Sequence, residues 1–103
     1  MLRIHTAFYR APGRLVFSRT NGLRAGSVVL KPSEVMPWHS TEGREELLII
    51  LAGRVHLETE PLSGRPVHVL LKAGQCAWLP RRTSHTVRNR SRRTARYLYV
   101  TGK

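Results

Sequence analysis

The chain has a single cysteine, Cys76, and therefore cannot form an internal disulfide. A protein that does without disulfides is typical of a reducing compartment, so we expect a cytoplasmic protein. Long apolar runs are also missing, because the longest, at residues 47–52, is far shorter than the roughly 18 residues of a membrane span. Charged residues interrupt the N-terminal stretch MLRIHTAFYR, which argues against a secretory signal. These absences predict a protein that is neither exported nor inserted in a membrane.

Acidic residues are scarce, with no aspartate and six glutamates against 18 lysines and arginines, giving a formal net charge of +12. Seven arginines are concentrated near the C-terminus: Arg81, Arg82, Arg88, Arg90, Arg92, Arg93 and Arg96. This bias indicates either binding of nucleic acid or another anion, or an arginine-rich solvated surface. No aromatic residue lies among residues 81–96 to stack on bases. We therefore favour the solvated surface, expect no nucleic-acid partner, and regard an acidic or phosphorylated small ligand as more plausible.

Helical periodicity, internal repeats and low-complexity linkers are absent from the 103 residues. Short apolar stretches instead alternate with turn signals, of which Asn21-Gly22 is the strongest and predicts a type I′ hairpin turn between LVFSR and LRAGSVVL. Further turns are expected at Gly53, Ser63-Gly64, Ala73-Gly74 and Asn89-Arg90-Ser91. Residues 54–60 and 66–72 alternate apolar and polar side chains, as half-buried strands do.

The segment EELLIILAG is ambiguous, because a glycine that could cap a helix follows good helix formers. Its short length between two strand-like segments favours a buried strand. About ten short antiparallel strands in one domain, residues 1–103, predict an all-β sandwich or barrel. A domain of this size leaves apolar surface uncovered, so we expect a homodimer.

Three potential metal ligands fall on separate predicted strands, with His39 at the end of one, Glu46 at the start of the next and His85 nearer the C-terminus. Inward positions of distant strands meet inside a rolled sheet. Two neutral imidazoles and one carboxylate suit a borderline or hard divalent cation and leave coordination positions open. The alternative is that both histidines are hydrogen-bonded and line a ligand pocket without a metal.

Two short segments resemble the paired motifs of the cupins, a family of small jelly-roll barrels. HSTEGREELLIILAG matches the first motif in His39, Glu46 and Gly53, with Thr41 where the family has a second histidine. GQCAWLPRRTSHTVRN matches the second in Gly74, Pro80, His85 and Asn89, with Arg82 in place of a glycine. Both motifs occur in order with a suitable gap, which is a specific signal. The chain is thus similar to a small single-domain cupin of type 2, and the resemblance implies a jelly-roll barrel.

The resemblance also implies one divalent metal held by His39, Glu46 and His85. Thr41 is a poor ligand beside imidazole, so a two-histidine, one-carboxylate site remains, which favours iron or manganese over zinc, nickel or copper. We expect such a protein to bind or act on a small molecule, for which an anion and dioxygenase- or isomerase-type chemistry are the candidates. A non-catalytic binding or sensor domain with a decayed metal site is the alternative, and whether the protein is an enzyme stays open.

Several residues near the motifs have both a functional and a structural interpretation. Trp38 and Trp78 flank the expected centre and could line its pocket, although core packing explains them equally well. Thr41, Asn89 and Glu42 are further pocket candidates, and Glu42 could substitute as a ligand from a loop. We expect Cys76 in the core and Glu45 in solvent or at an interface. His56 and His68 are expected to lie singly at the surface or in packing, without a histidine partner.

Overall fold

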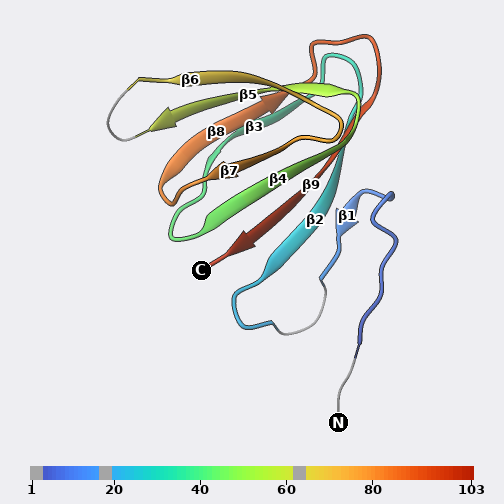
Figure 1. The fold of residues 1–103 in the computed structure, drawn as a ribbon, viewed down its shortest axis with the longest axis vertical. Coiled ribbons are helices and arrows are strands. Elements are labelled where there is room, and N and C mark those ends of the chain that lie inside the picture. Colours follow the sequence, from blue (N-terminus) through green and yellow to red (C-terminus); the bar gives the residue numbers. More distant parts are fainter. Residues whose placement is uncertain (1–3, 17–19, 62–64) are drawn as a thin grey trace.

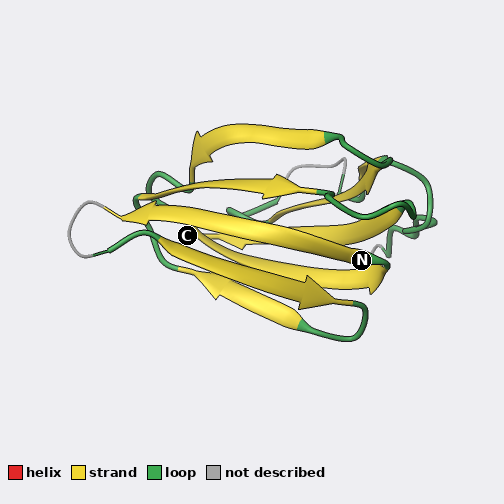
Figure 2. Ribbon diagram, turned by 90° about the horizontal axis from the view of Figure 1, so that it is seen from above, coloured by secondary structure: helices red, strands yellow, loops and turns green. Residues whose placement is uncertain are grey.

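The computed structural model describes residues 4–16, 20–61 and 65–103 (Figure 1). Strands and loops make up this part of the chain, and no described helix is long and apolar enough to cross a membrane (Figure 2). The strands are β1 (Gly13–Arg14), β2 (Arg24–Leu30), β3 (Val35–Ser40), β4 (Glu45–Ala52), β5 (Arg54–Pro61), β6 (Val67–Lys72), β7 (Cys76–Leu79), β8 (Thr83–Arg88) and β9 (Ala95–Gly102). These nine strands confirm the predicted all-β class and come close to the expected number.

Two antiparallel sheets face each other to form a jelly-roll barrel. One sheet has the order β1-β2-β9-β4-β7, and the other has the order β3-β8-β5-β6. Neighbours in each sheet are mostly distant in sequence, so that β4 lies between β9 and β7, and β8 lies between β3 and β5 (Figure 1). This topology brings the two motif segments, which are far apart along the chain, to the same interior.

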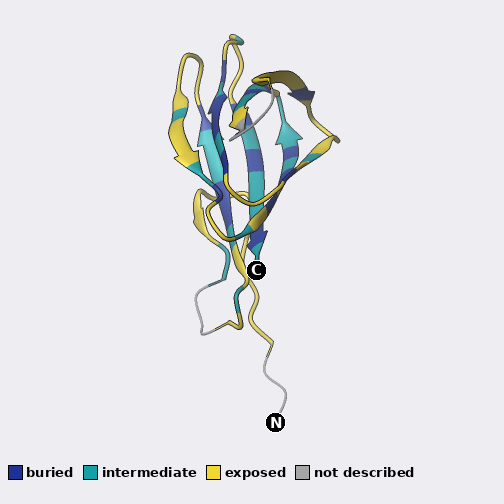
Figure 3. Cartoon of the chain, turned by 90° about the vertical axis from the view of Figure 1, so that its left-hand side faces the viewer, coloured by how far each residue is buried: buried dark blue, intermediate teal, exposed yellow. Residues whose placement is uncertain are grey.

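Alternation along the strands fills the space between the sheets with apolar side chains. In β4, Leu48 and Ile50 are buried while Leu47 is exposed, so the ambiguous EELLIILAG segment is a strand, as its length favoured. Val55 and Leu57 of β5 face the same core, as predicted. Figure 3 shows that the buried residues lie mainly in the strands, whereas the loops are mostly exposed. The full buried apolar core comprises Leu30, Leu48, Ile50, Val55, Leu57, Leu71, Leu79, Val87, Ala95 and Tyr97.

Two departures from the expected burial lie on edge strands. In β6, Leu71 is buried but Val67 and Val69 are exposed, because β6 is the last strand of its sheet. Cys76, expected in the core, is exposed on β7, which is the edge of the other sheet. Cys76 pairs with Ile49 of β4, whose neighbours Leu48 and Ile50 face the core, so Cys76 lies on the outer face of the sheet.

The Asn21-Gly22 hairpin prediction was wrong in its turn type. Gly22 has a φ of 99°, but Asn21 is not among the described residues with positive φ, as a type I′ turn requires. The partner strand β1 is Gly13–Arg14, immediately before the expected LVFSR segment, so the connection to β2 is much longer than two residues. Residues 17–19 of that segment, and the turn predicted at Ser63-Gly64, lie outside the described residues.

Positive backbone φ angles explain two motif positions. Gly53, between β4 and β5, has a φ of 70°, and a Cβ there would lie 2.8 Å from the Thr94 carbonyl oxygen, so only glycine fits. Gly74, before β7, has a φ of 92°. Arg82 has a φ of 56° in the position where the family has glycine, so the left-handed conformation persists without the residue that adopts it most easily.

Candidate metal centre

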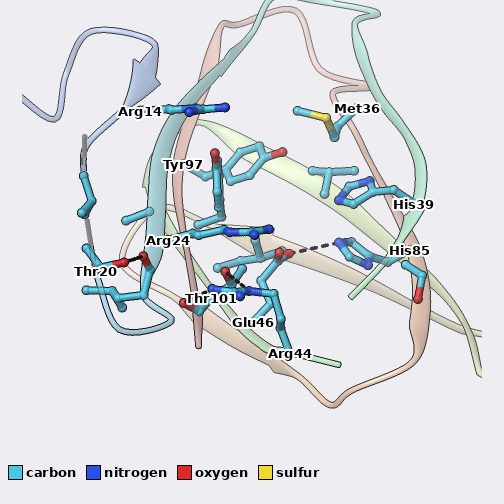
Figure 4. Close-up of a pocket in the computed structure, with 17 residues that line it drawn as sticks. Arg14, Thr20, Arg24, Met36, His39, Arg44, Glu46, His85, Tyr97 and Thr101 are labelled. Carbon is cyan, nitrogen blue, oxygen red and sulfur yellow. Dashed lines mark hydrogen bonds and ion pairs between the residues drawn. The ribbon is translucent and has the colours of Figure 1, made fainter. Parts of the chain in front are cut away.

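His39, Glu46 and His85 converge in the barrel interior from both sheets. His39 on β3 is directly paired with His85 on β8, and their ring centroids lie 4.2 Å apart. Glu46 reaches across from β4 in the facing sheet, and its Oε2 lies 3.0 Å from His85 Nε2 (Figure 4). One candidate ligand atom of each residue lies within 4.8 Å of the other two. Side chains remote in sequence thus present two imidazoles and a carboxylate to one point.

A bulge in β3 turns His39 toward this point. The pairing of β3 with β8 shifts register between Met36 and His39, so one extra residue is inserted between them. Strict alternation would place Met36 and His39 on opposite faces, but both line the same pocket. The bulge therefore determines which side chain of β3 faces the interior, as bulges beside functional sites often do.

Backbone carbonyls orient both imidazoles in the same way. His39 Nδ1 lies 2.8 Å from the Pro37 carbonyl oxygen, and His85 Nδ1 lies 3.1 Å from the Thr83 carbonyl oxygen. In each case Nδ1–H donates to the carbonyl two residues earlier, which leaves Nε2 as the nitrogen available to a cation. Such outer hydrogen bonds fix the tautomer and ring orientation of metal-binding histidines. The donor set therefore fits a divalent cation in both atom type and orientation.

His85 and Glu46 are buried together, with 1% and 8% of their surface exposed. Burial tends to lower the pKa of His85, but the hydrogen bond to Glu46, the Thr83 carbonyl and the Glu46 charge outweigh it, and the pKa is raised above 6.5. Without a cation, His85 therefore keeps its second proton to a higher pH than a free histidine does, and in that form each ring nitrogen is a donor. The proton on Nε2 occupies the place that a metal would need.

Thr41, in the position of the family's second histidine, forms a structural link and does not line the pocket. Its hydroxyl donates to the Pro80 carbonyl at 2.7 Å and accepts from the Thr83 backbone N–H at 3.0 Å. These bonds tie the end of β3 to the turn between β7 and β8. The hydroxyl of Thr41 thus already donates one hydrogen bond and accepts another, so Thr41 is not available as a metal ligand in this conformation.

The other pocket candidates lie away from the three ligands. Trp38 is exposed on the outer side of the β3 bulge, and Trp78 is exposed on β7, where its Nε1–H donates to Glu45 at 3.1 Å. Glu42 is exposed in the β3–β4 turn with a φ of 54° and is not part of the candidate ligand cluster. Asn89 is buried at the far end of β8, where it organises the loop before β9. None of the four lines the pocket that contains His39, Glu46 and His85.

That pocket, with a volume of about 730 Å³, has three arginines in its lining that the sequence reasoning missed. Arg14 on β1, Arg24 on β2 and Arg44 just before β4 extend toward the interior (Figure 4). Register explains the first two, because Arg14 pairs with Gly26 and Arg24 pairs with Thr101, both on the inner face of their sheet. These strand pairings could not be read from the sequence.

Arg44 could have been found from the sequence, because it lies two residues before Glu46 and so shares its face in an extended chain. Its Nε–H donates to Thr101 Oγ1 at 2.9 Å, and its Nη2 donates to the Gly22 carbonyl. Arg44 is therefore held in place beside the carboxylate. Among the described residues that line this pocket, Glu46 is the single carboxylate, against three guanidinium groups.

Tyr97 and Tyr99 of β9 also line this pocket. Tyr97 is buried, and burial together with the Glu46 charge and Tyr99 raises the pKa of its phenol. The hydroxyl therefore stays protonated at neutral pH. Tyr99 packs over Gly26, its direct partner on β2, where the absence of a Cβ makes room for the ring.

His56 and His68 contradict the expectation that they lie apart. They occupy adjacent strands β5 and β6, and His56 Nδ1 lies 2.8 Å from His68 Nε2 on the outer side of the barrel. Burial lowers the pKa of His56, and the nearby charges of His68, Arg90 and Arg54 lower it further. Cross-strand pairing, which the alternation of two separate strands does not specify, accounts for the contact.

Comparison with solved structures shows the same fold in several proteins. The Cnp3 cupin domain of Schizosaccharomyces pombe has a TM-score of 0.77 at 15% identity, over 89% of this chain and 63% of that one. The CENP-C cupin domain of Drosophila melanogaster has a TM-score of 0.72 at 16% identity, over 84% and 72%. An oxalate oxidase has a TM-score of 0.72 at 17% identity, over 80% of this chain and 42% of that one. The chain thus spans less than two thirds of the first and third of these structures.

Sequence comparison gives the family directly. A search of curated protein sequences found no significant match to this chain. The family model described as "Cupin domain", however, matches residues 26–101, which include both motifs, all of strands β3 to β8 and most of β2 and β9. This match covers well over half of the chain and agrees with the barrel and its topology. The chain therefore belongs to the cupin domain family.

Proposed function

We propose that this protein is a metal-dependent cupin whose pocket binds and acts on a small anionic molecule. The observation that carries the proposal is that His39, Glu46 and His85 meet in a pocket also lined by Arg14, Arg24 and Arg44. The three ligand candidates account for a cation, and the arginines account for the charge of the molecule that would lie beside it.

The donor set supports one divalent cation held by His39 Nε2, His85 Nε2 and the Glu46 carboxylate. Two imidazoles and one carboxylate are typical of mononuclear iron sites and also suit manganese. When bound, such a cation supplies Lewis-acid or redox chemistry to a substrate oxygen. The pocket opens past His39, which is exposed, whereas Glu46 and His85 are buried, so a substrate would approach from the His39 side.

The charge of the pocket supports an anionic ligand. Three guanidinium groups face one carboxylate, and a bound divalent cation would raise the excess of positive charge further. No arginine of the pocket forms an ion pair within the described residues, where the six glutamates of the chain all lie. Arg14 and Arg24 are exposed at the pocket mouth, while Arg44 is fixed by its hydrogen bonds. Guanidinium groups bind carboxylates and phosphates through paired N–H donors.

A non-catalytic binding or sensor domain is the second candidate. It is favoured by the role of Thr41, whose hydroxyl is occupied by Pro80 and Thr83, so that the site has three protein donors where the family motif supplies four. A cation held by three donors can still bind an anion without turning it over. Under either function we expect a cytoplasmic homodimer, as the sequence predicts.

The decisive experiment is elemental analysis of the purified protein and its histidine variants. We expect about one equivalent of iron or manganese in the parent protein, and its loss in His39→Ala and His85→Ala, because each variant removes one of three protein donors. His56→Ala is the matched control, since it removes a histidine on the outer side of the barrel. Full metal content in the His39 and His85 variants, at native fold by circular dichroism, would overturn the proposal.

Turnover then distinguishes the two candidate functions. The metal-loaded protein is incubated with small carboxylates and phosphorylated acids, and both binding and product formation are measured. Product formation supports the enzyme, and binding without product supports the sensor domain. In both cases Arg24→Gln should weaken binding of the anion without lowering metal content, because Arg24 lines the pocket but offers no metal ligand.

A further inference from the structure

A second cationic pocket lies at the opposite end of the barrel. It has a volume of about 670 Å³ and is formed by the β4–β5 turn, the β6–β7 turn and the loop between β8 and β9. Strand β4 runs from Glu46 in the first pocket to Ala52 beside the second, a span of roughly 20 Å at the usual rise of an extended chain. The two pockets are therefore separate sites.

Five cationic side chains line the second pocket: Arg54, Lys72, Arg90, Arg92 and Arg93. None of the described residues that line it is acidic. Within the described residues Arg90 has one ion pair, with Glu58 at 3.3 Å, and Glu58 also approaches Arg88 at 3.7 Å. The other four cations form no ion pair with any described carboxylate. Like charges at this density repel one another, and a bound polyanion would relieve that repulsion.

A buried side chain holds the arginine-bearing loop in shape. Asn89 is 1% exposed, and its Nδ2 donates to the carbonyl oxygens of Leu30 and Arg93, both at 2.8 Å. Its Oδ1 accepts from the backbone N–H and the hydroxyl of Ser91. The amide thus uses its donors and its acceptor to fix the loop, so the backbone that carries Arg90, Arg92 and Arg93 is organised before any ligand arrives. Preorganisation of this kind lowers the entropy cost of binding.

We propose that this end of the barrel is a second binding site, for a small polyanion that carries adjacent phosphate groups. Four arginines offer planar sets of N–H donors, which match phosphate oxygens in pairs. The described part of the lining contains no aromatic side chain on which a base could stack, so a small ligand fits better than a single-stranded nucleic acid. The positive field extends to His56, whose pKa is lowered by burial and, further, by His68, Arg90 and Arg54.

Titration calorimetry of the full chain with inorganic tripolyphosphate, at low salt, tests this site. Arg92→Gln/Arg93→Gln should weaken binding about tenfold or more, because two charge-assisted contacts are lost. Arg54→Gln/Lys72→Gln should have a similar effect from the two facing turns. These four side chains are exposed, so the fold should tolerate the changes, which circular dichroism verifies.

Two control variants remove the same charge elsewhere. Arg65→Gln/Arg81→Gln alters exposed residues of the β5–β6 and β7–β8 connections, away from the second pocket. This variant should bind tripolyphosphate with an affinity within about twofold of the parent, because only long-range charge is changed. Arg14→Gln/Arg24→Gln alters the first pocket and should also retain binding.

Three results would overturn the proposal. Equal weakening by all double variants would show attraction to net charge alone. Loss confined to Arg14→Gln/Arg24→Gln would place the polyanion in the first pocket. Tighter binding of a single-stranded oligonucleotide than of tripolyphosphate, abolished by Arg92→Gln/Arg93→Gln, would identify a nucleic-acid surface instead. Because the first pocket has its own test in metal content, failure of either proposal leaves the other standing.

Discussion

Glu46 Oε2 and His85 Nε2 approach to 3.0 Å across the two sheets of the barrel. This distance suits a hydrogen bond from a protonated imidazole to a carboxylate, and both side chains are almost fully buried. A proton and a metal ion therefore compete for the same nitrogen. The competition makes both metal binding and folding stability depend on pH.

We expect the protein to bind a divalent cation more tightly above pH 6.5 than below it. The pKa of His85 is raised above 6.5, so the proton on Nε2 must leave before a cation binds. Calorimetry in buffers of different ionisation enthalpy should detect release of a proton on binding at pH 6.5. An affinity that does not change between pH 5.5 and pH 8, or proton release that persists unchanged in His85→Ala, would contradict this assignment.

Stability of the metal-free protein should have the opposite pH dependence. A histidine with a raised folded pKa contributes stability below its unfolded pKa of about 6.5, and that contribution is lost as pH rises through the folded value. Chemical denaturation of the metal-free protein should therefore show a higher midpoint at pH 5.5 than at pH 8.5, over and above the trend of the control. His85→Gln, in which the titrating group is removed, is that control.

Replacement of Thr41 by valine should destabilise the fold without changing metal content. Valine is nearly isosteric, but it leaves the Pro80 carbonyl and the Thr83 N–H without the threonine hydroxyl. Loss of both bonds at a site that is 7% exposed should cost about 1–3 kcal/mol in free energy of unfolding. Denaturant titration measures this loss and elemental analysis measures the metal. If Thr41→Val lost the metal at unchanged stability, threonine would be a ligand and not a structural link.

Arg82→Gly should stabilise the protein by roughly 0.5–1 kcal/mol, because glycine adopts positive φ without the steric penalty of a side chain. Arg82 is exposed with a φ of 56°, and its backbone N–H donates to the Glu42 carbonyl at 2.8 Å, a bond that glycine would keep. The neighbouring residue Arg81 is also exposed but does not have a positive φ, so Arg81→Gly should give no gain in stability in the same denaturation assay. Equal effects at the two positions would exclude backbone strain as the cause.

Gly26→Ala should reshape the pocket wall. A Cβ on Gly26 would lie 2.4 Å from the ring of Tyr99, its partner on β9, so the ring must move. Overpacking of this kind costs about 1–3 kcal/mol in free energy of unfolding. Adding Tyr99→Leu, which removes the clashing ring atoms, should recover part of that loss, as a double-mutant cycle would measure. Additive losses in the cycle would mean that the two side chains do not interact.

The sequence was sufficient to predict the fold class, the strand at residues 45–52 and the convergence of His39, Glu46 and His85. Each of these follows from local alternation or from a motif of fixed spacing. The pocket arginines Arg14 and Arg24 could not be predicted, because their orientation depends on the pairing of β1 with β2 and of β2 with β9. Register between strands that are distant in sequence is a property of the assembled sheet.

Local irregularities account for the remaining differences. The bulge in β3 turns Trp38 outward and His39 inward, although a regular strand would alternate differently. His56 and His68 form a pair because β5 and β6 place them diagonally opposite, which neither strand specifies alone. Asn89 matches the second motif, but its amide organises a loop at the far end of the barrel and not the metal pocket. A motif position can thus be structural even when its neighbours in the motif are ligand candidates.

The division of the three ligand candidates between the sheets has a mechanical consequence. His39 and His85 belong to one layer and Glu46 to the other, so an ion bound by all three would add a cross-link between layers that loops, apolar packing and contacts such as that of Glu46 with His85 already join. Spreading of the layers would break coordination, and loss of the ion would let the open end of the barrel widen. Occupancy by the ion would therefore govern the rigidity of the pocket mouth, through which any small molecule must pass.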